Sequence, residues 1–301
     1  PLGDWRVDKA TDTESMFEGA SAFDLNRKFK FGNWRLTNEM LRDWVKRWCD
    51  CNRWQMPPIS TWNTSRVTDM SYLFHGKSKF NEDISAWNTS NVTNMSWMFQ
   101  GASVFNQPLN DWRVDKVTRM DRIFDHASAF NQPLNDWRVN NVARMDLMFL
   151  YASAFNQPLG KWRVDNVTNM SWMFANASAF NQPLSDWRVD KVTNMSCMFQ
   201  NASSFNQPLN DWRVDNVTDM SSMFSQASSF NQPLNDWRVD KVTDMRSMFH
   251  GASAFNQPLG NWRVDNATNV GRMFKGSAFS HWEDLGDPRL RSQKPSCCAV
   301  S

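Results

Sequence analysis

The chain has 301 residues, and its 33 basic and 31 acidic residues leave a net charge of only +2. A charge so close to zero gives no long-range attraction to nucleic acid or to anionic lipid. The five cysteines are too few and too scattered to form a disulfide framework. No run of 18 apolar residues occurs, so the sequence contains no candidate transmembrane helix.

The dominant feature of the chain is a repeat of 25 residues. A Trp recurs with this spacing from Trp62 to Trp262, and a Phe does so from Phe74 to Phe274. A fixed period of this length is typical of a solenoid, in which each coil buries its apolar side by stacking on its neighbours. The repeat therefore predicts one elongated array of coils and not two globular domains.

The first 61 residues are predicted to differ from the array. Residues 1–33 carry the motif of one repeat and are expected to form a partial upstream coil. Residues 34–61 break the period and contain a segment with helical spacing, for which Thr37 is the predicted N-cap. Its apolar face carries Leu41, Trp44, Val45 and Trp48. We predict that this helix covers the open apolar end of the array and does not form a binding site.

The repeats at residues 62–284 each contain two patterns. Around Trp112, apolar and polar residues alternate, as in a short strand. After Asp115, a predicted helix N-cap, the apolar residues are spaced three and four apart, as in a short amphipathic helix. These apolar residues are Val117, Met120, Phe124 and Ala127.

Together these patterns predict an α/β repeat solenoid. Its right-handed coils would be similar to those of leucine-rich repeats, each with one short parallel strand and one short helix. The alternative is a β-solenoid with two short strands per coil and only a tight turn at residues 120–124. A row of Asn from Asn106 to Asn256 is predicted to pair with backbone groups between coils, because buried amides need partners.

Residues 285–301 are rich in Gly, Pro, Arg, Lys and Ser and are predicted to form a disordered tail. The chain ends with Cys298, two small aliphatic residues and a serine, which matches the signal for farnesylation of that cysteine. Cys297 beside it would carry a palmitoyl chain, since stable anchoring takes two lipid signals. Such lipidation would place the protein on the cytoplasmic face of a membrane.

Three motifs match a known repeat: Ala-Phe-Asn-Gln-Pro-Leu at 129–134, Trp-Arg-Val at 162–164, and Val-Thr-Asn-Met-Ser-Trp-Met-Phe at 167–174. They resemble the BspA-like repeat, a leucine-rich repeat found in bacterial surface proteins, mycoplasma lipoproteins and many unicellular eukaryotes. The resemblance covers nearly the whole chain. It implies that residues 34–61 are a helical N-terminal cap and that the protein is an adhesin or interaction module at a cell surface. One departure is that Arg mostly follows the Trp here, where that family usually has an acidic residue.

An Arg follows the Trp in most repeats, on the outer face of the predicted strand. An Asp two residues later can pair with it in most coils, and such surface pairs contribute little stability. The alternative interpretation is a binding site for a repeating anion, such as an acidic polysaccharide, recognised by the guanidinium groups. This Arg row consists of Arg113, Arg138, Arg163, Arg188, Arg213, Arg238 and Arg263.

Two columns vary between coils: the residue two before Phe74 and its equivalents, and the residue after it. Columns that vary within a uniform array are expected to be exposed, and exposed aromatic residues mark contact surfaces. One apolar cluster in these columns is our predicted protein-contact surface: Trp97, Leu147, Leu150 and Trp172.

No catalytic pattern is present in the sequence. The four His have no recurrent carboxylate or nucleophile partner, and no phosphate-binding loop, zinc signature or nucleophile elbow occurs. We therefore predict no enzyme, cofactor or metal site. The expected function is a monomeric scaffold for protein–protein interaction or adhesion. The alternatives are an acidic-glycan binder and a lipid-anchored intracellular scaffold, and no nucleic acid is expected as a partner.

Overall fold

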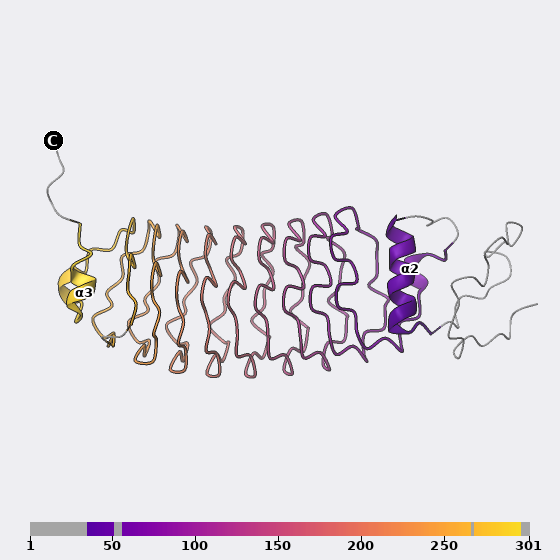
Figure 1. Cartoon of the computed structure of the whole chain (residues 1–301), viewed down its shortest axis with the longest axis horizontal. Helices are drawn as coiled ribbons and strands as arrows, with labels where there is room; N and C mark the ends of the chain where they lie inside the picture. Colours follow the sequence, from indigo (N-terminus) through magenta and orange to yellow (C-terminus); the bar gives the residue numbers. More distant parts are fainter. Residues whose placement is uncertain (1–34, 51–55, 266–267, 296–301) are drawn as a thin grey trace, which may run out of the picture.

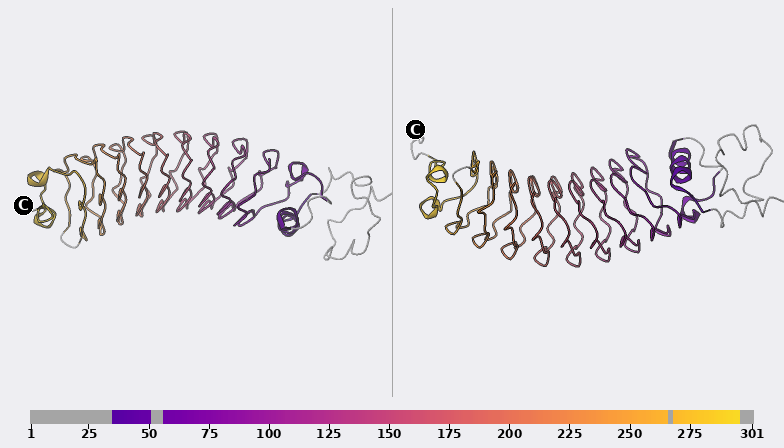
Figure 2. Two further views of the ribbon diagram at one scale, coloured as in Figure 1. Left: turned by 90° about the horizontal axis from the view of Figure 1, so that it is seen from above. Right: turned by 60° about the horizontal axis from the view of Figure 1, so that its bottom comes forward.

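The computed structural model describes residues 35–50, 56–265 and 268–295. Its coils lie side by side along one long axis, with the helix α2 (Asn38–Asp50) at one end and α3 (Pro288–Arg291) at the other (Figure 1). Two short 3-10 helices, η3 (Ile59–Thr61) and η4 (Trp282–Asp284), lie next to these ends in the chain. Side views show that the array bends gently (Figure 2). The predicted repeat solenoid is therefore the fold.

The secondary structure predicted for each coil is wrong. Trp112 and Val114 are buried and Arg113 is exposed, as the alternation predicts, but these residues form no strand. Residues 117–127 form no helix either. In the described array, neighbouring coils are instead joined by single parallel bridges, such as the one between Asn94 and Arg119. The rest of each coil consists of turns and extended segments.

A ladder of consecutive turns replaces the predicted helix. Alternate amides donate to the carbonyl 24 residues later in the next coil, as Trp97 does to Asp121 at 3.0 Å. The amides between them donate to the carbonyl three residues earlier, as Met98 does to Met95 at 3.3 Å. The Ser96 amide donates to the Oδ1 atom of Asn94. This pattern pairs the backbone groups within the coil and with both neighbours, so no helix is needed to satisfy them.

The turns require a left-handed backbone at two positions per coil. An α-helix needs φ near about −63° at every residue, whereas φ is +62° at Trp97, +58° at Arg122 and +57° at His126. Apolar residues spaced three and four apart still point inward, because each turn returns the chain to the core side. Apolar spacings of three and four are thus compatible with an α-helix and with consecutive turns. The tight turn at residues 120–124 agrees with the alternative β-solenoid, although the two strands per coil of that alternative are absent from the described coils.

The core consists of stacked identical side chains. Phe149 and Phe174 lie 5.5 Å apart with their planes at 6°, and Trp162 and Trp187 lie 6.3 Å apart at 2°. In the stacked Trp column from Trp87 to Trp262, each indole N–H donates to a carbonyl 28 residues earlier, as Trp162 does to Leu134 at 2.8 Å. The polar atom of each Trp in this column is therefore paired although the ring is buried.

The Asn row has the structural role that the sequence predicts. The Asn156 Oδ1 atom accepts a hydrogen bond from the Asn181 amide at 3.0 Å and another from Gln182 Nε2 at 3.0 Å. The same contacts recur between neighbouring coils; for example, the Asn156 amide donates to Asn131 Oδ1 at 2.9 Å. The row thus holds coils together through one side-chain oxygen per coil.

Replacement of Asn156 by Ala should lower the free energy of unfolding by about 1–2 kcal/mol, because it leaves two donors of the next coil without this acceptor. Denaturation in urea measures the change. Asn141→Ala is the matched control, since its exposed side chain makes one contact, to the Asp115 carbonyl. An equal loss in both variants would contradict the structural role of the row.

Helix α2 covers the first coil. Its N-cap is Thr37, whose Oγ1 accepts the Met40 amide at 3.3 Å, and Leu41 and Val45 are fully buried. Trp44 and Trp48 pack edge-on against Trp62, at 5.2 and 5.8 Å between ring centroids. The helix also forms hydrogen bonds with backbone groups of the first coil, which has no preceding coil to pair with them. Asn38 Oδ1 accepts the Thr68 amide at 2.9 Å, and Arg42 donates to the Ser71 carbonyl.

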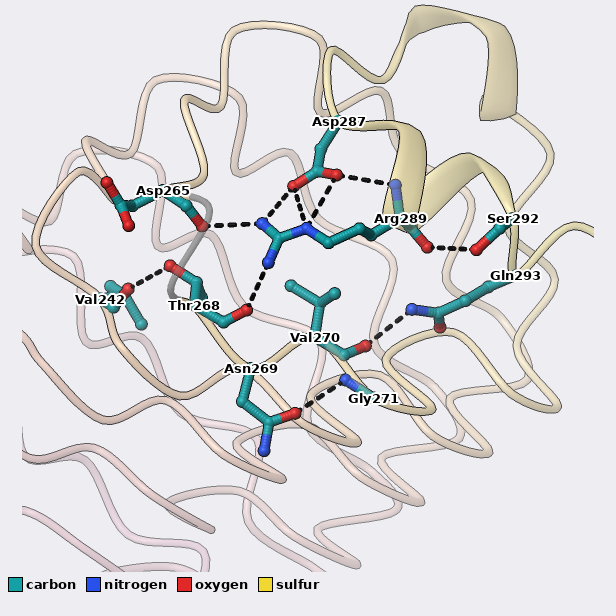
Figure 3. Close-up of polar contacts among 10 residues, drawn as sticks. All are labelled: Val242, Asp265, Thr268, Asn269, Val270, Gly271, Asp287, Arg289, Ser292 and Gln293. Carbon is teal, nitrogen blue, oxygen red and sulfur yellow. Dashed lines mark hydrogen bonds and ion pairs between the residues drawn. The ribbon is translucent and has the colours of Figure 1, made fainter.

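Residues 285–295 are folded, where the sequence analysis expects a disordered tail. Leu285 and Leu290 are buried against the last coil. Arg289 reaches back to the carbonyls of Asp265 and Thr268 at 2.7 and 2.9 Å (Figure 3). It also pairs with Asp287, and this hydrogen bond holds the pKa of the Asp287 carboxyl below its usual value. The segment therefore closes the C-terminal end of the array by satisfying its last carbonyls.

Candidate binding surfaces

All seven side chains of the Arg row are exposed. Arg113 and Arg163 pair with the Asp two residues later, at 3.3 and 3.1 Å, and Arg213 lies 3.9 Å from Asp190 of the preceding coil. Within the described residues, no ion pair involves Arg138, Arg188 or Arg263. Ion pairs this exposed contribute little to stability.

A second row of carboxylates flanks the Arg row on its other side. It consists of the exposed residues Asp111, Asp136, Asp186, Asp211 and Asp236. Lys161 takes the place of an Asp in this row, and its hydrogen bond lowers the pKa of the Asp136 carboxyl. Because Asp side chains lie on both sides of the Arg row, the local attraction to a polyanion is weak.

The first variable column has one backbone conformation throughout. Its φ values lie between 54 and 62° in every coil from Tyr72 to Arg272. Tyr72 is 51% exposed and Trp172 is 37% exposed, as predicted for a variable column, but Cys197 is buried. Burial raises the pKa of the Cys197 thiol to about 11, so this thiol is unreactive near neutral pH.

The second variable column is buried in four of its nine coils, which corrects the predicted contact surface. Leu150 is only 7% exposed, and Asp125 and Ala175 in the same column are buried as well. Leu150 therefore belongs to the interior. Trp172 is exposed and Trp97 is half-buried, and three repeats separate them, so they do not form one compact cluster.

A larger surface feature lies along the first column and a third column, which is four residues later in each coil. The third column is the second left-handed position of the coil and holds Gly in several coils: Gly76, Gly101, Gly251 and Gly276. Two coils carry a ring in place of Gly there, His126 and Tyr151, and these rings stack at 4.4 Å. We call the exposed and half-buried rings of the two columns, with the Arg among them, the aromatic ridge. It consists of Tyr72, Trp97, Arg122, His126, Tyr151 and Trp172.

Contacts connect the part of the ridge from Tyr72 to Tyr151. Tyr72 and Trp97 stack at 5.4 Å with their planes at 18°, and the guanidinium carbon of Arg122 lies 4.4 Å from the Trp97 ring centroid. The buried carboxylate of Asp125 accepts from Arg122 at 3.0 Å and contacts His126 Nδ1. One carboxylate thus links the two left-handed columns. Tyr72, His126 and Tyr151 were not among the predicted contact residues. The Gly residues at the positions equivalent to His126 and Tyr151 would have indicated a common backbone conformation.

The described residues contain no catalytic constellation. His126 pairs with Asp125 and His281 with Asp284, but no serine hydroxyl or cysteine thiol of the described chain hydrogen bonds to either imidazole. No group of three or more metal-ligating side chains occurs in this part of the chain, and none of its helices could cross a membrane. Cys297 and Cys298 lie outside the described residues.

These observations define a repeat solenoid with a closed helical end, a folded C-terminal end and an exposed ridge of rings. The chain belongs to the family described as "Mycoplasma protein of unknown function, DUF285", whose model matches residues 1–54, 44–158, 136–222 and 187–285. No curated protein matches the chain. One solved structure that it resembles is "Crystal structure of TLR13-ssRNA13 complex", at 10% identity and a TM-score of 0.23. The match covers 81% of this chain and 53% of that one. At so low a score, the likeness carries no argument.

Proposed function

We propose that the protein is a non-enzymatic scaffold that binds a macromolecular partner along the aromatic ridge. The observation that carries the proposal is the combination of backbone strain and exposure. A non-glycine residue in the left-handed region costs about 1–2 kcal/mol, and burial does not offset this for Tyr72 and Trp172, which are 51% and 37% exposed. The turn requires this conformation in every described coil, so the feature that the fold does not explain is the exposure of large rings in this column.

The residue types of the ridge support the same interpretation. Tyr, Trp and Arg are the side chains most enriched at the energetic centres of interfaces. Elsewhere the array places Gly or Asn at a left-handed position, for example Gly101 and Asn176, so rings are not required for the turn. The rings therefore contribute something other than the fold.

The proposal also includes the cellular location at which the protein binds its partner. The BspA-like resemblance supports adhesion at a cell surface, whereas Cys297 and Cys298 support a lipid-anchored scaffold inside the cell. Peptide mass spectrometry of the protein from its own cells separates the two, because a farnesyl group on Cys298 requires the cytoplasm. Binding of an acidic polysaccharide through the Arg row is a weaker proposal, because Asp rows flank the Arg side chains.

The test is an array that carries purified extracellular proteins and purified glycans side by side. It is probed with the labelled full chain and with a ridge variant that combines Tyr72→Asn, Trp97→Asn and Trp172→Asn. Asn tolerates a left-handed backbone, so these changes remove the rings without new strain. The double variant Ser222→Asn/Ser247→Asn makes the same change in the polar half of the column and serves as the control.

We expect binding by the wild-type chain and the control, and loss of that binding in the ridge variant. Unfolding in urea must show the three proteins to be equally folded. Binding that persists in the ridge variant, or a wild-type chain that binds nothing on the array, would overturn the proposal.

A further inference from the structure

We infer that the ridge binds a neutral polysaccharide, whose chain lies along the axis of the array; this inference rests on the proposed function. The rings of the ridge have a linear arrangement. Tyr72, Trp97, Tyr151 and Trp172 come from different coils, and those coils lie in order along the long axis (Figure 1). A partner that contacts them all must be extended and is best matched by a polymer with its own repeat.

Part of the ring surface of the ridge remains accessible. Stacked carbon atoms touch at about 3.5–4.0 Å, but the Tyr72 and Trp97 centroids are 5.4 Å apart with nearly parallel planes. The two rings are therefore offset. The Arg122 guanidinium also lies over the Trp97 ring, so the accessible ring surface of the ridge belongs to Tyr72 and Trp172, which are 51% and 37% exposed, and to Tyr151. Tyr151 is likewise 45% exposed. Such partly open faces suit the apolar C–H side of a sugar ring.

The ridge and its border carry charged side chains of both signs. Asp125 neutralises Arg122 at 3.0 Å. Arg119 pairs with Asp121 at 3.1 Å, and Arg144 pairs with Asp146 at 2.9 Å. These pairs leave no excess charge of either sign among the three Arg and three Asp, so the ridge does not select an ionic partner. An uncharged polymer fits this surface better than an acidic one.

The polar atoms of the ridge rings differ from those of the core Trp rings in their hydrogen bonds. The indole N–H of a core Trp has a carbonyl partner, as at Trp162. By contrast, the described structure has no hydrogen bond from the indoles of Trp97 and Trp172 or from the hydroxyls of Tyr72 and Tyr151 to other protein groups. Each ring thus offers an apolar surface beside a polar atom that is available to a sugar hydroxyl.

The width of the ridge also favours a polymer chain over a folded protein. A stable protein interface buries about 1,200–2,000 Å² in total, and it needs a broad apolar centre. The ridge supplies only one or two side chains per coil, and the charged pairs at Arg119 and Arg144 border it. A strip of this shape matches a chain one sugar ring wide.

Affinity gel electrophoresis tests the inference. The full chain runs through native gels that contain a soluble β-1,3-glucan, a mannan or amylose, and through gels that contain hyaluronan. We expect retardation by at least one of the three neutral polymers, unchanged by added salt. In the Tyr72→Asn/Trp97→Asn/Trp172→Asn variant, the affinity should fall about tenfold or more, since each lost ring removes a stacking contact. The Ser222→Asn/Ser247→Asn control should bind like the wild type.

Failure of this inference is distinguishable from failure of the proposed function. Ridge-dependent binding to proteins on the array, with no retardation by the three neutral polymers, overturns the inference and leaves the proposed function intact. Retardation by hyaluronan alone, abolished by salt, also overturns it and points to the Arg row. Retardation that the ridge variant retains overturns both.

Discussion

Replacement of Phe174 by Ala should lower the free energy of unfolding by about 3–5 kcal/mol, because it removes a fully buried ring and leaves a cavity. The ring contacts three other Phe rings, at 5.5 Å in Phe149, 4.1 Å in Phe180 and 5.7 Å in Phe199. The cavity cannot close easily, since the turn ladder and the Asn row fix the distance between coils. Denaturation in guanidinium chloride, followed by circular dichroism, measures the loss.

The position of Phe174 in the middle of the array has a second consequence. Each coil contacts only its neighbours, so a weak coil divides the array into two parts that unfold separately. We expect a broader transition with a lower m-value than in the wild type. Val104→Ala is the control, because Val104 is 45% exposed and its truncation should change stability little. A single sharp transition, with a loss no larger than in the control, would contradict the stacked-core account.

The repeat and its interior could be predicted from the sequence, because the period reports directly on which residues face inward. The cap helix was predictable too, since Thr37 and the apolar spacing after it are local signals. The strand and helix of each coil were not, because apolar spacings of three and four arise in a helix and in consecutive turns alike. The recurrence of Gly76 and Gly101 in one column could have indicated a turn, because both have a left-handed backbone.

The candidate surfaces could be predicted only in part. The Arg row is exposed as expected, since alternation around the Trp decides its side. Variability did not predict exposure at Leu150, which is buried although its column varies between coils. The pairing of His126 with Tyr151 depends on contact between residues 25 apart, which no local pattern reveals. Composition also failed to predict that residues 285–295 are folded. Arg289 donates hydrogen bonds to carbonyls that are available only at the last coil of the array, and composition does not report on such contacts.

Replacement of Ser247 by Val should lower the free energy of unfolding by about 1–3 kcal/mol, because a β-branched residue is strained in a left-handed conformation. The φ value at Ser247 is +55°, and its amide donates to the Gly271 carbonyl at 2.9 Å, so the backbone cannot relax without losing a ladder bond. Ser247→Asn is the matched variant, since Asn tolerates this conformation; it should be neutral or slightly stabilising.

The relative stability of these two variants distinguishes the turn ladder from a helical coil, which the apolar spacing would fit equally well. In a helix, Val and Asn have nearly the same propensity, so the two proteins would differ by only a few tenths of a kcal/mol. In the ladder, Val is the worse residue by at least about 1 kcal/mol, because strain acts on Val and not on Asn. Urea denaturation of both variants beside the wild type measures the difference. Equal stabilities would contradict the left-handed column, and with it the argument that the rings of the ridge are held in strained positions.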